Sequence, residues 1–300
     1  MRPSPIVLFA YNRPDHTRQT VEALQKNLLA NDSDLIVFSD ASKSKVQAKK
    51  VCEVRQYIRK INGFRSVTLV EREVNLGLAR SIIDGVTMMV NKYGRIIVLE
   101  DDMVTSPYFL TYMNEALEKY ANDDRVVSIH GYVYPVGQTL PDAFFLPGAD
   151  CWGWATWSRG WACFNSDGQF LLDELKRRKL THMFDYNGTY PFSKMLRDQI
   201  RGANDSWAVR WYASAFLAGK LTLYPGRSLV HNIGNDNSGI HCGELADLDV
   251  KLSETPINLN HIVVEPSPEF RQAFEDFFRQ IQTGLLQRLM RNIRTLLSVG

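Results

Sequence analysis

The sequence predicts an α/β fold in which a mostly parallel sheet is covered by helices on both faces. Short apolar runs alternate with amphipathic stretches through residues 1–130. The runs are apolar throughout rather than at every second position, which is typical of strands buried on both faces. With 300 residues, 45% of them hydrophobic and 23% charged, the chain has an ordinary globular composition and room for one large or two small domains.

Each apolar run in this first part is followed by residues with helical spacing. Apolar side chains recur there at three- or four-residue steps, which predicts helices that pack on the sheet. The predicted strands are residues 6–10, 35–38, 67–70, 96–99 and 126–129. The predicted helices are residues 15–29, 46–61, 78–90 and 108–120. Strands joined in this way by helical crossovers run parallel.

The pattern changes after residue 130. Residues 131–165 are rich in glycine, proline and aromatic residues and have no clear period, and residues 231–259 are polar and turn-rich, which predicts a loop. The remaining predicted elements are helices over residues 170–178 and 206–219 and a strand over residues 221–224. We therefore divide the chain into residues 1–130, 131–265 and 266–300.

The last 35 residues form a predicted amphipathic helix. Its apolar stripe consists of Phe270, Phe274, Phe277, Ile281, Leu285, Leu289, Ile293 and Leu296. After Asp276 no acid occurs, whereas Arg279, Arg288, Arg291 and Arg294 follow. An apolar stripe beside a basic face suits a helix that lies on an anionic membrane surface. The alternative is a helix docked on the rest of the chain with its arginines in water.

Charge and cysteine content narrow the class of protein. The formal net charge is +2, which argues against a nucleic-acid binder. The four cysteines form no C-x-x-C pair and are too few for a disulfide scaffold. The apolar run at residues 6–10 is shorter than a signal-peptide core, and no stretch has the roughly 20 apolar residues of a spanning helix. We expect a cytoplasmic protein, with the tail as its candidate contact with the inner membrane face.

Three adjacent acids, Glu100, Asp101 and Asp102, directly follow the predicted strand at residues 96–99. Ligands of open α/β sheets bind at the carboxyl ends of the strands, which is where these acids fall. Neighbouring carboxylates repel one another unless a cation lies among them, and their oxygens suit Mg²⁺ or Mn²⁺ bridging a diphosphate. A solvated acidic turn is the alternative. Neither a G-x-G-x-x-G after the first strand nor a P-loop motif is present, so a metal and side chains would have to neutralise any bound phosphates.

Three further motifs, together with these acids, resemble the GT-A glycosyltransferases. They are Phe-Ala-Tyr-Asn-Arg-Pro at residues 9–14, Phe-Ser-Asp at 38–40 and Asn-Leu-Gly-Leu-Ala-Arg at 75–80. Their order and spacing are most similar to family-2-type bacterial sugar transferases and the related N-acetylglucosaminyltransferases, over roughly residues 5 to 242. The resemblance implies a Rossmann-like GT-A fold with a nucleotide-sugar-binding half, an acceptor-side subdomain with a closing loop, and a C-terminal helical tail.

The resemblance also implies roles for individual residues. Those placed around the nucleotide and donor are Ala10, Tyr11, Asn12, Arg13, Asp40, Asn75, Arg80 and Asp101. Among them Asp40 would bind the nucleobase, for which uracil with its N3–H donor is the best match, and Arg80 would face the diphosphate or donor sugar. Asp102 would bind the metal directly, helped by His241 of the closing loop, with His231 in reserve. Asp40 as a turn residue, Arg80 as a surface arginine and a structural histidine are the alternatives.

Aromatic residues gather in the second part of the chain. Trp152, Trp154, Trp157 and Trp161 are four of the six tryptophans. Indole rings offer flat apolar faces for sugars and N–H donors for hydroxyls, so the loop is a candidate sugar pocket. The residues assigned to the donor sugar or acceptor are Glu100, Trp152, Gly153, Trp154 and Trp207. For any single tryptophan, a place in a buried aromatic core is the stronger alternative.

Asn204-Asp205-Ser206-Trp207 resembles the acid-then-tryptophan element that supplies the catalytic base of inverting members. A carboxylate there can accept the proton of the acceptor hydroxyl as the new bond forms. Relatives often have the acid directly before the tryptophan, whereas Ser206 intervenes here. Capping of the following helix by Asp205 is the alternative, and the two roles are compatible.

These residues predict a metal-dependent, inverting glycosyltransferase that uses Mn²⁺ or Mg²⁺. It would move a sugar from a nucleotide-diphosphate sugar, with UDP favoured, to a hydroxyl of a glycan or lipid-linked acceptor in bacterial surface polysaccharide synthesis. Two alternatives stay open. A sugar-1-phosphate nucleotidyltransferase would need a glycine-rich basic loop after the first strand, and a non-catalytic carbohydrate-binding protein would leave the three acids unexplained.

Overall fold

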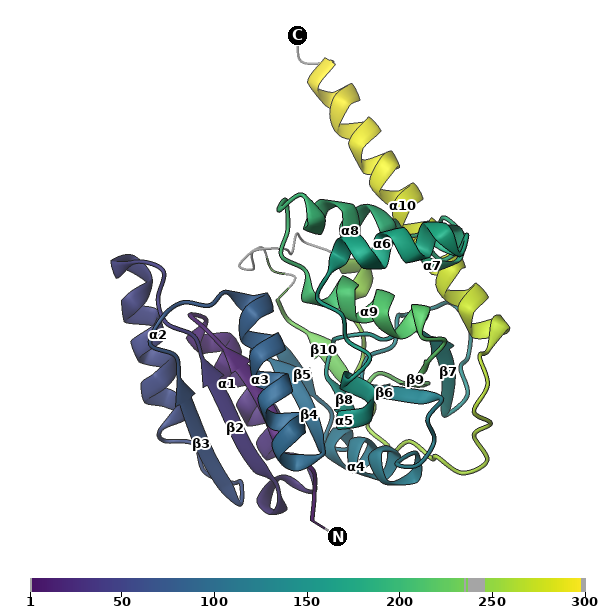
Figure 1. The fold of residues 1–300 in the computed structure, drawn as a ribbon. Coiled ribbons are helices and arrows are strands. Elements are labelled where there is room, and N and C mark those ends of the chain that lie inside the picture. The colour runs from purple at the N-terminus through teal and green to yellow at the C-terminus, as the bar shows by residue number, and fades with distance from the viewer. Residues whose placement is uncertain (1, 235, 237–245, 298–300) are drawn as a thin grey trace.

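The computed structural model describes residues 2–234, 236 and 246–297, the side chains of residues 246 and 283–297 excepted (Figure 1). Its strands are β1 Ile6–Ala10, β2 Asp34–Ser39, β3 Ser66–Glu71, β4 Arg95–Glu100, β5 Met103–Thr105, β6 Val126–His130, β7 Ala143–Pro147, β8 Trp154–Trp157, β9 Leu221–Pro225 and β10 Val230–Asn232. Its α-helices are α1 Pro14–Gln25, α2 Lys45–Ile58, α3 Leu78–Tyr93, α4 Phe109–Lys119, α5 Ser158–Trp161, α6 Gly168–Arg177, α7 Thr181–Phe184, α8 Phe192–Ile200, α9 Trp207–Leu217 and α10 Pro268–Leu297. Two 3₁₀ turns, η1 Ala30–Asp32 and η2 Ala246–Leu248, complete the elements described.

Eight strands form one sheet in the order β3-β2-β1-β4-β8-β6-β9-β7. The pairs β1–β2, β1–β4, β2–β3 and β6–β9 are parallel, whereas β8 runs antiparallel to β4 and β6, and β7 antiparallel to β9. The mostly parallel α/β sheet predicted from the apolar runs is thus confirmed. β10 pairs separately with β5, just after the three acids.

The chain reverses its direction of travel across the sheet between β1 and β4. Strands β1 to β3 extend the sheet to one side, and β4 returns to the other side of β1. At such a switch point the loops after neighbouring strands separate and leave a crevice at the carboxyl ends. The loop after β1 and the acids at the end of β4 both lie at these carboxyl ends.

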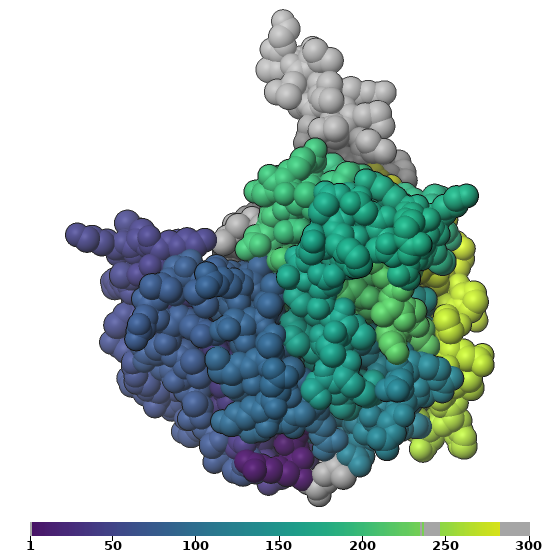
Figure 2. Space-filling model, viewed as in Figure 1, coloured from purple at the N-terminus to yellow at the C-terminus, as the bar shows by residue number. Residues whose placement is uncertain are grey.

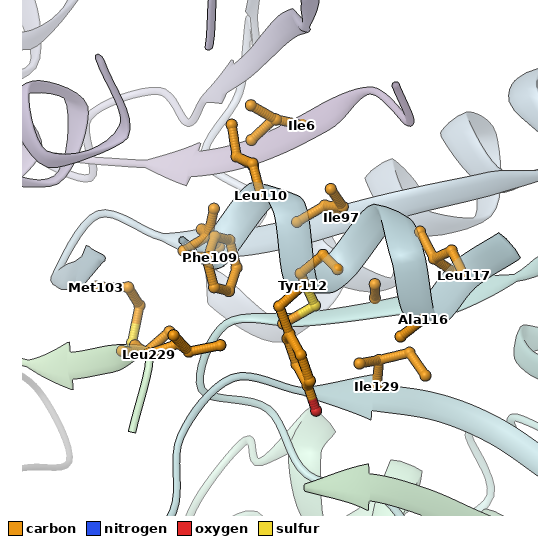
Figure 3. Packing of buried hydrophobic residues seen from close by; sticks show 14 of the residues in the cluster. Ile6, Ile97, Met103, Phe109, Leu110, Tyr112, Ala116, Leu117, Ile129 and Leu229 are labelled. Carbon is orange, nitrogen blue, oxygen red and sulfur yellow. The ribbon is translucent and has the colours of Figure 1, made fainter. Parts of the chain in front are cut away.

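Helices cover both faces of the sheet (Figure 1). On one face, α1, α2 and α4 pack in a cluster that includes Phe109, Leu110 and Tyr112 against Ile6 and Ile97 (Figure 3). On the opposite face, α3, α5 and α9 form a second cluster, which holds three of the buried tryptophans, Trp161, Trp207 and Trp211, together with Trp154 of β8. Burial on both faces explains why β1, β2 and β4 contain apolar runs without alternation, whereas β3 at the edge of the sheet is only partly buried.

The segment from 131 to 165 is more regular than its composition suggests. It contains β7, β8 and the short helix α5, where the sequence predicted no element. β8 is inserted between β4 and β6, so residues 1–130 and 131–265 share one continuous sheet, and their surfaces meet along a long boundary in Figure 2. Helices α7 and α8 and strand β10 were also missed, and the first helix ends at Gln25 rather than at residue 29.

Helix α10 begins on the second half of the molecule. Phe274 and Phe278 are almost fully buried in a third cluster with side chains of α6, α8 and α9, and Phe270 and Ile281 pack against it. The first part of the predicted apolar stripe is therefore docked on the body, as the alternative interpretation of the tail expected. The ribbon of α10 then continues away from the body (Figure 1), and Leu285, Leu289, Ile293 and Leu296 lie where side chains are not described. None of the described helices has both the length and the apolar composition needed to cross a membrane.

Candidate functional site

The acids after β4 meet the loop after β1. In the parallel register Phe9 lies opposite Glu100, so the next residues of each strand emerge side by side. The backbone N–H of Tyr11 donates to Asp101 Oδ2 at 3.3 Å. The hydroxyl of Thr20, in α1, donates to the carbonyl oxygen of Asp101 at 2.9 Å. Residues from both strands and from α1 therefore fix this corner of the site.

Arg13 is the cation of the cluster. Its Nη2 contacts Asp102 Oδ2 at 2.7 Å and also bonds Asp101 Oδ1. Burial alone would lower the pKa of Arg13, but the charges of Asp101 and Asp102 raise it above its usual value. The guanidinium is therefore permanently charged and bridges two carboxylates that would otherwise repel each other.

Asp102 has one carboxylate oxygen that is not used. Its Oδ1 is buried and has no hydrogen-bond partner among the described residues. The carbonyl oxygen of Asp102 accepts from Ile233 N at 2.9 Å, which brings the segment after β10 against the acid. A Cβ on Gly234 would lie 2.3 Å from Asp102 Oδ2, so only glycine fits beside it. A buried, unpaired carboxylate oxygen is costly unless a ligand completes it.

This oxygen fits a divalent metal that is held largely by its substrate. Among the described residues, no group of three or more His, Cys, Asp or Glu side chains is placed to hold a metal ion. Mg²⁺ typically takes one or two carboxylates and completes its shell with phosphate oxygens and water. Asp102 could offer one such ligand through Oδ1, since Arg13 occupies its other oxygen. His241 lies outside the described residues, whereas its reserve, His231, is in β10 opposite Val104, and its Nδ1 is buried without a described partner.

Glu100 is the last residue of β4 and directly precedes the two aspartates. Burial, together with repulsion from Asp102 and Asp101, raises the pKa of Glu100 to about 8, although Arg13 and a hydrogen bond from Trp207 oppose the shift. A carboxyl group in this state is largely neutral at pH 7, which reduces the negative charge of the cluster.

The second predicted nucleotide element is a loop tied to the end of β2. Asp40 accepts hydrogen bonds from the backbone N–H groups of Ala41, Leu76 and Gly77 at 2.9 to 3.1 Å. Asn75 Nδ2 donates to the carbonyl oxygen of Ala41 at 2.5 Å. The structure thus brings residues 40 and 75–77 together, and Asp40 fixes the loop that begins α3. Contact of Asp40 with a nucleobase stays a prediction.

The other residues of this group also lie along the crevice. Ala10 is buried at the end of β1, and its carbonyl oxygen accepts from Asp40 N at 3.2 Å. The hydroxyl of Tyr11 donates to Gln47 Oε1 at 2.7 Å and so links the loop to α2. Asn12 is partly exposed beside it.

Arg80 and Asp205 line one cavity of about 460 Å³ between α3 and α9. Arg80 is exposed in the first turn of α3. The side chain of Asp205 is 66% exposed, and its Oδ1 lies 3.6 Å from Nη2 of Arg210, which is buried. Asp84 also borders the cavity and is ion-paired with Arg72. The two residues assigned by resemblance to leaving group and base therefore face the same space.

The helix after Asp205 is capped by its neighbour. Ser206 Oγ accepts from Val209 N at 3.2 Å and forms the N-cap of α9. Capping by Asp205, the alternative considered from the sequence, is therefore wrong. The serine that separates the acid from Trp207 supplies the cap, which leaves the Asp205 carboxylate available to the cavity.

The tryptophans divide into core and site. Trp154 is 1% exposed and Trp207 is 3% exposed, and their rings stack at 5.6 Å within the second cluster. This burial favours the alternative of an aromatic core for Trp154 and Trp207, and their contact with a sugar stays a prediction. Trp152 is partly exposed and packs edge-on against Tyr132 at 4.7 Å. Gly153 has a φ of +63° and no space for a Cβ beside Val230, so it sets the turn that presents Trp152.

A buried histidine that the sequence did not single out holds this turn. Trp152 N donates to His130 Nε2 at 3.1 Å, and His130 itself is fully buried. Burial lowers the pKa of His130 despite the nearby Asp150, so the ring is neutral and accepts this bond. Its position at the end of a predicted strand was the signal available. Gly234 was missed too, because nothing in the sequence links it to Asp102.

One comparison with known proteins identifies the family of this chain. A family model described as glycosyl transferase family 2 matches residues 6–192. No curated protein matches the chain. Among solved structures, residues 1–349 of TarS from S. aureus, in complex with UDP, are 13% identical with a TM-score of 0.33, and the match covers 46% of this chain and 38% of that one. The mannosyltransferase PcManGT from Pyrobaculum calidifontis, in complex with GDP-Man and Mn²⁺, is 14% identical with a TM-score of 0.37, and the match covers 72% of this chain and 70% of that one.

Proposed function

The chain belongs to glycosyl transferase family 2, and on that premise we propose that it moves a sugar from a nucleoside-diphosphate sugar to a hydroxyl of a glycan or lipid-linked acceptor. Because the members of this family are glycosyltransferases, we favour this function over the two alternatives, a sugar-1-phosphate nucleotidyltransferase and a non-catalytic carbohydrate-binding protein. A specific relation to the N-acetylglucosaminyltransferases stays a prediction.

One observation carries the proposal. At the switch point of the sheet, Asp102 presents a buried carboxylate oxygen without a described partner, next to a permanent cation on Arg13. This pairing of an open anionic ligand with a fixed positive charge suits a diphosphate and its divalent metal. A crevice at the carboxyl ends of β1 and β4 is also where ligands of open α/β sheets bind.

Mn²⁺ or Mg²⁺ would be held by Asp102, with His241 or His231 as further candidate ligands. When bound, the ion neutralises the negative charge that develops on the departing nucleoside diphosphate. Among the protein's own residues, Arg80 would stabilise the same negative charge. It lines the cavity and can donate to a phosphate oxygen of the diphosphate. Asn75 and Asp40 hold the loop that places Arg80 at the start of α3.

Asp205 is our candidate for the base. Its carboxylate would accept the proton of the acceptor hydroxyl while the acceptor oxygen bonds the anomeric carbon and the bond to the diphosphate oxygen breaks. Such a single displacement inverts the anomeric configuration. Support comes from the exposure of Asp205 and from the cavity that it shares with Arg80. Trp152 is the candidate platform for a sugar ring.

The biological setting rests on the tail. A basic, apolar helix at residues 283–297 suits contact with an anionic membrane, and thus a lipid-linked acceptor of surface polysaccharide synthesis at the cytoplasmic face. Uracil is the base that we test first.

Calorimetric titration tests the proposal. UDP is titrated into the full chain with and without Mn²⁺, and GDP is titrated in parallel. We expect metal-dependent binding of one nucleotide, lost in Asp102→Asn. Absence of binding with both nucleotides, with and without Mn²⁺, would reject the nucleotide-sugar site.

A further inference from the structure

We propose that Arg13 competes with the metal for Asp102, so that the free protein binds the ion weakly and takes it up together with the donor diphosphate. The inference rests on the proposed function, because it concerns how the same site is filled. It makes Arg13 a positioning residue that couples the binding of two ligands.

The geometry places Arg13 where it blocks half of the metal ligand. A single atom, Nη2, contacts carboxylate oxygens of both Asp101 and Asp102. Asp102 is thereby left with one open oxygen, Oδ1, rather than two. A divalent ion on Oδ1 would lie next to the guanidinium in a region that is largely closed to water, where like charges repel strongly.

The arrangement of the chain allows Arg13 to release Asp102. Its backbone is anchored, since the carbonyl oxygen of Arg13 accepts from Thr17 N at 2.9 Å at the start of α1. Its side chain is 20% exposed at the crevice, so a change of rotamer can carry the guanidinium toward a ligand. A diphosphate brings negative charge that suits both cations, and guanidinium groups bind phosphate oxygens well.

Competition and a merely structural role predict opposite effects of removing Arg13 on metal binding. If Arg13 only held the acids in place, then removing it would disorder the site and weaken metal binding. If it competes with the metal, then removing its charge strengthens binding of the ion alone and reduces the gain that the nucleotide provides.

Mn²⁺ binding to the full chain tests this, with free Mn²⁺ measured by electron paramagnetic resonance in the absence and presence of UDP or GDP. We expect Arg13→Gln to bind Mn²⁺ alone about tenfold or more tightly than the unaltered chain. Arg13→Lys, which keeps the charge, should stay close to the unaltered chain. Arg18→Gln is the matched control, because Arg18 is an exposed arginine of α1, the helix that directly follows Arg13, and it pairs with Asp15 rather than with the acids. Equal or weaker binding by Arg13→Gln would overturn the inference.

A charge-balanced double variant tests the inference if Arg13→Gln does not fold. The double variant Arg13→Gln/Asp101→Asn removes the cation together with one of its partners. It should bind Mn²⁺ more tightly than Asp101→Asn alone, and the reverse order would contradict the inference. If the unaltered chain binds no Mn²⁺ with either nucleotide, the metal dependence of the proposed function fails instead, so the two failures are distinguishable.

Discussion

Ser206 caps helix α9 in place of its neighbour Asp205. The Ser206 hydroxyl accepts the Val209 N–H at 3.2 Å, while the side chain of Asp205 is 66% exposed and borders the cavity shared with Arg80. Ser206 thus has the structural role of helix cap, and the adjacent Asp205 remains the candidate catalytic residue. An aspartate engaged as a helix cap would have its carboxylate committed to backbone N–H groups.

This separation predicts different effects for the two residues. Asp205→Asn should lower the turnover number by about 100-fold or more, because the amide cannot accept the acceptor proton. Nucleotide affinity should stay unchanged, and the free energy of unfolding should change little, because the Asp205 side chain is largely exposed and its contact with Arg210 is long. Ser206→Ala should instead lower the free energy of unfolding by about 1 kcal/mol. Donor turnover and urea unfolding measured on both variants check this, and full turnover by Asp205→Asn would remove it from the mechanism.

Gly234→Ala should weaken metal-dependent nucleotide binding. The new Cβ would lie 2.3 Å from Asp102 Oδ2, and the buried acid cannot easily yield because Arg13 holds it. We expect a loss of affinity of about tenfold, measured by calorimetry. Gly137→Ala is the control, since a Cβ there meets nothing within 4 Å. Similar losses in both variants would show that the effect does not come from Asp102.

Trp152 and Trp154 should respond in opposite ways to replacement by alanine. Trp154 is 1% exposed and stacks on Trp207, so Trp154→Ala should cost about 3–5 kcal/mol of stability. Trp152 is partly exposed, and its loss should reduce sugar transfer with a much smaller effect on unfolding. Chemical unfolding and initial rates on both variants test this. A large loss of stability in Trp152→Ala would place it in the core.

The first half of the fold can be predicted from the sequence, because the pattern that predicts each element lies within the residues of that element. Strands β1, β2 and β4 each contain one contiguous apolar run, and the three acids begin with Glu100, the last residue of β4. Strand β8 was missed because its four residues, Trp-Ala-Thr-Trp, carry no period, and its state is set by pairing with β4 and β6. The difference between the buried Trp154 and the partly exposed Trp152 likewise depends on neighbours that are distant in sequence, such as Trp207. The contacts of Asp40 with residues 76 and 77 depend on tertiary structure in the same way.

The pKa of His130 predicts a pH dependence of stability. Burial lowers this pKa below its ordinary value of 6.5, and Asp150 offsets the effect only in part. Below pH 6.5 the unfolded chain therefore binds a proton that the folded chain resists, so this contribution is present above pH 6.5 and is lost as the pH falls. We expect the unaltered chain to lose the stability contributed by the neutral His130 ring as the pH falls below 6.5.

His130→Gln isolates this contribution, because a glutamine oxygen can still accept from Trp152 N but does not titrate. Unfolding free energies of the variant should lack the decline below pH 6.5. Subtracting the two curves also removes groups with the opposite slope, such as Glu100, whose raised pKa favours the protonated folded state. Parallel curves for both proteins would show that His130 is not the source.

The two parts of helix α10 should differ in role, the first stabilising the fold and the second binding a membrane. Residues up to Ile281 pack on the body through Phe274 and Phe278, so Phe274→Ala should lower the free energy of unfolding by about 3 kcal/mol or more. Removing residues 283–300 should spare the fold, because that packing is retained. The removed segment contains Arg288, Arg291 and Arg294 and no acid, so its loss should reduce flotation with vesicles containing anionic phosphatidylglycerol. Neutral phosphatidylcholine vesicles are the control, and equal flotation of both chains on anionic vesicles would reject a membrane role for the tail.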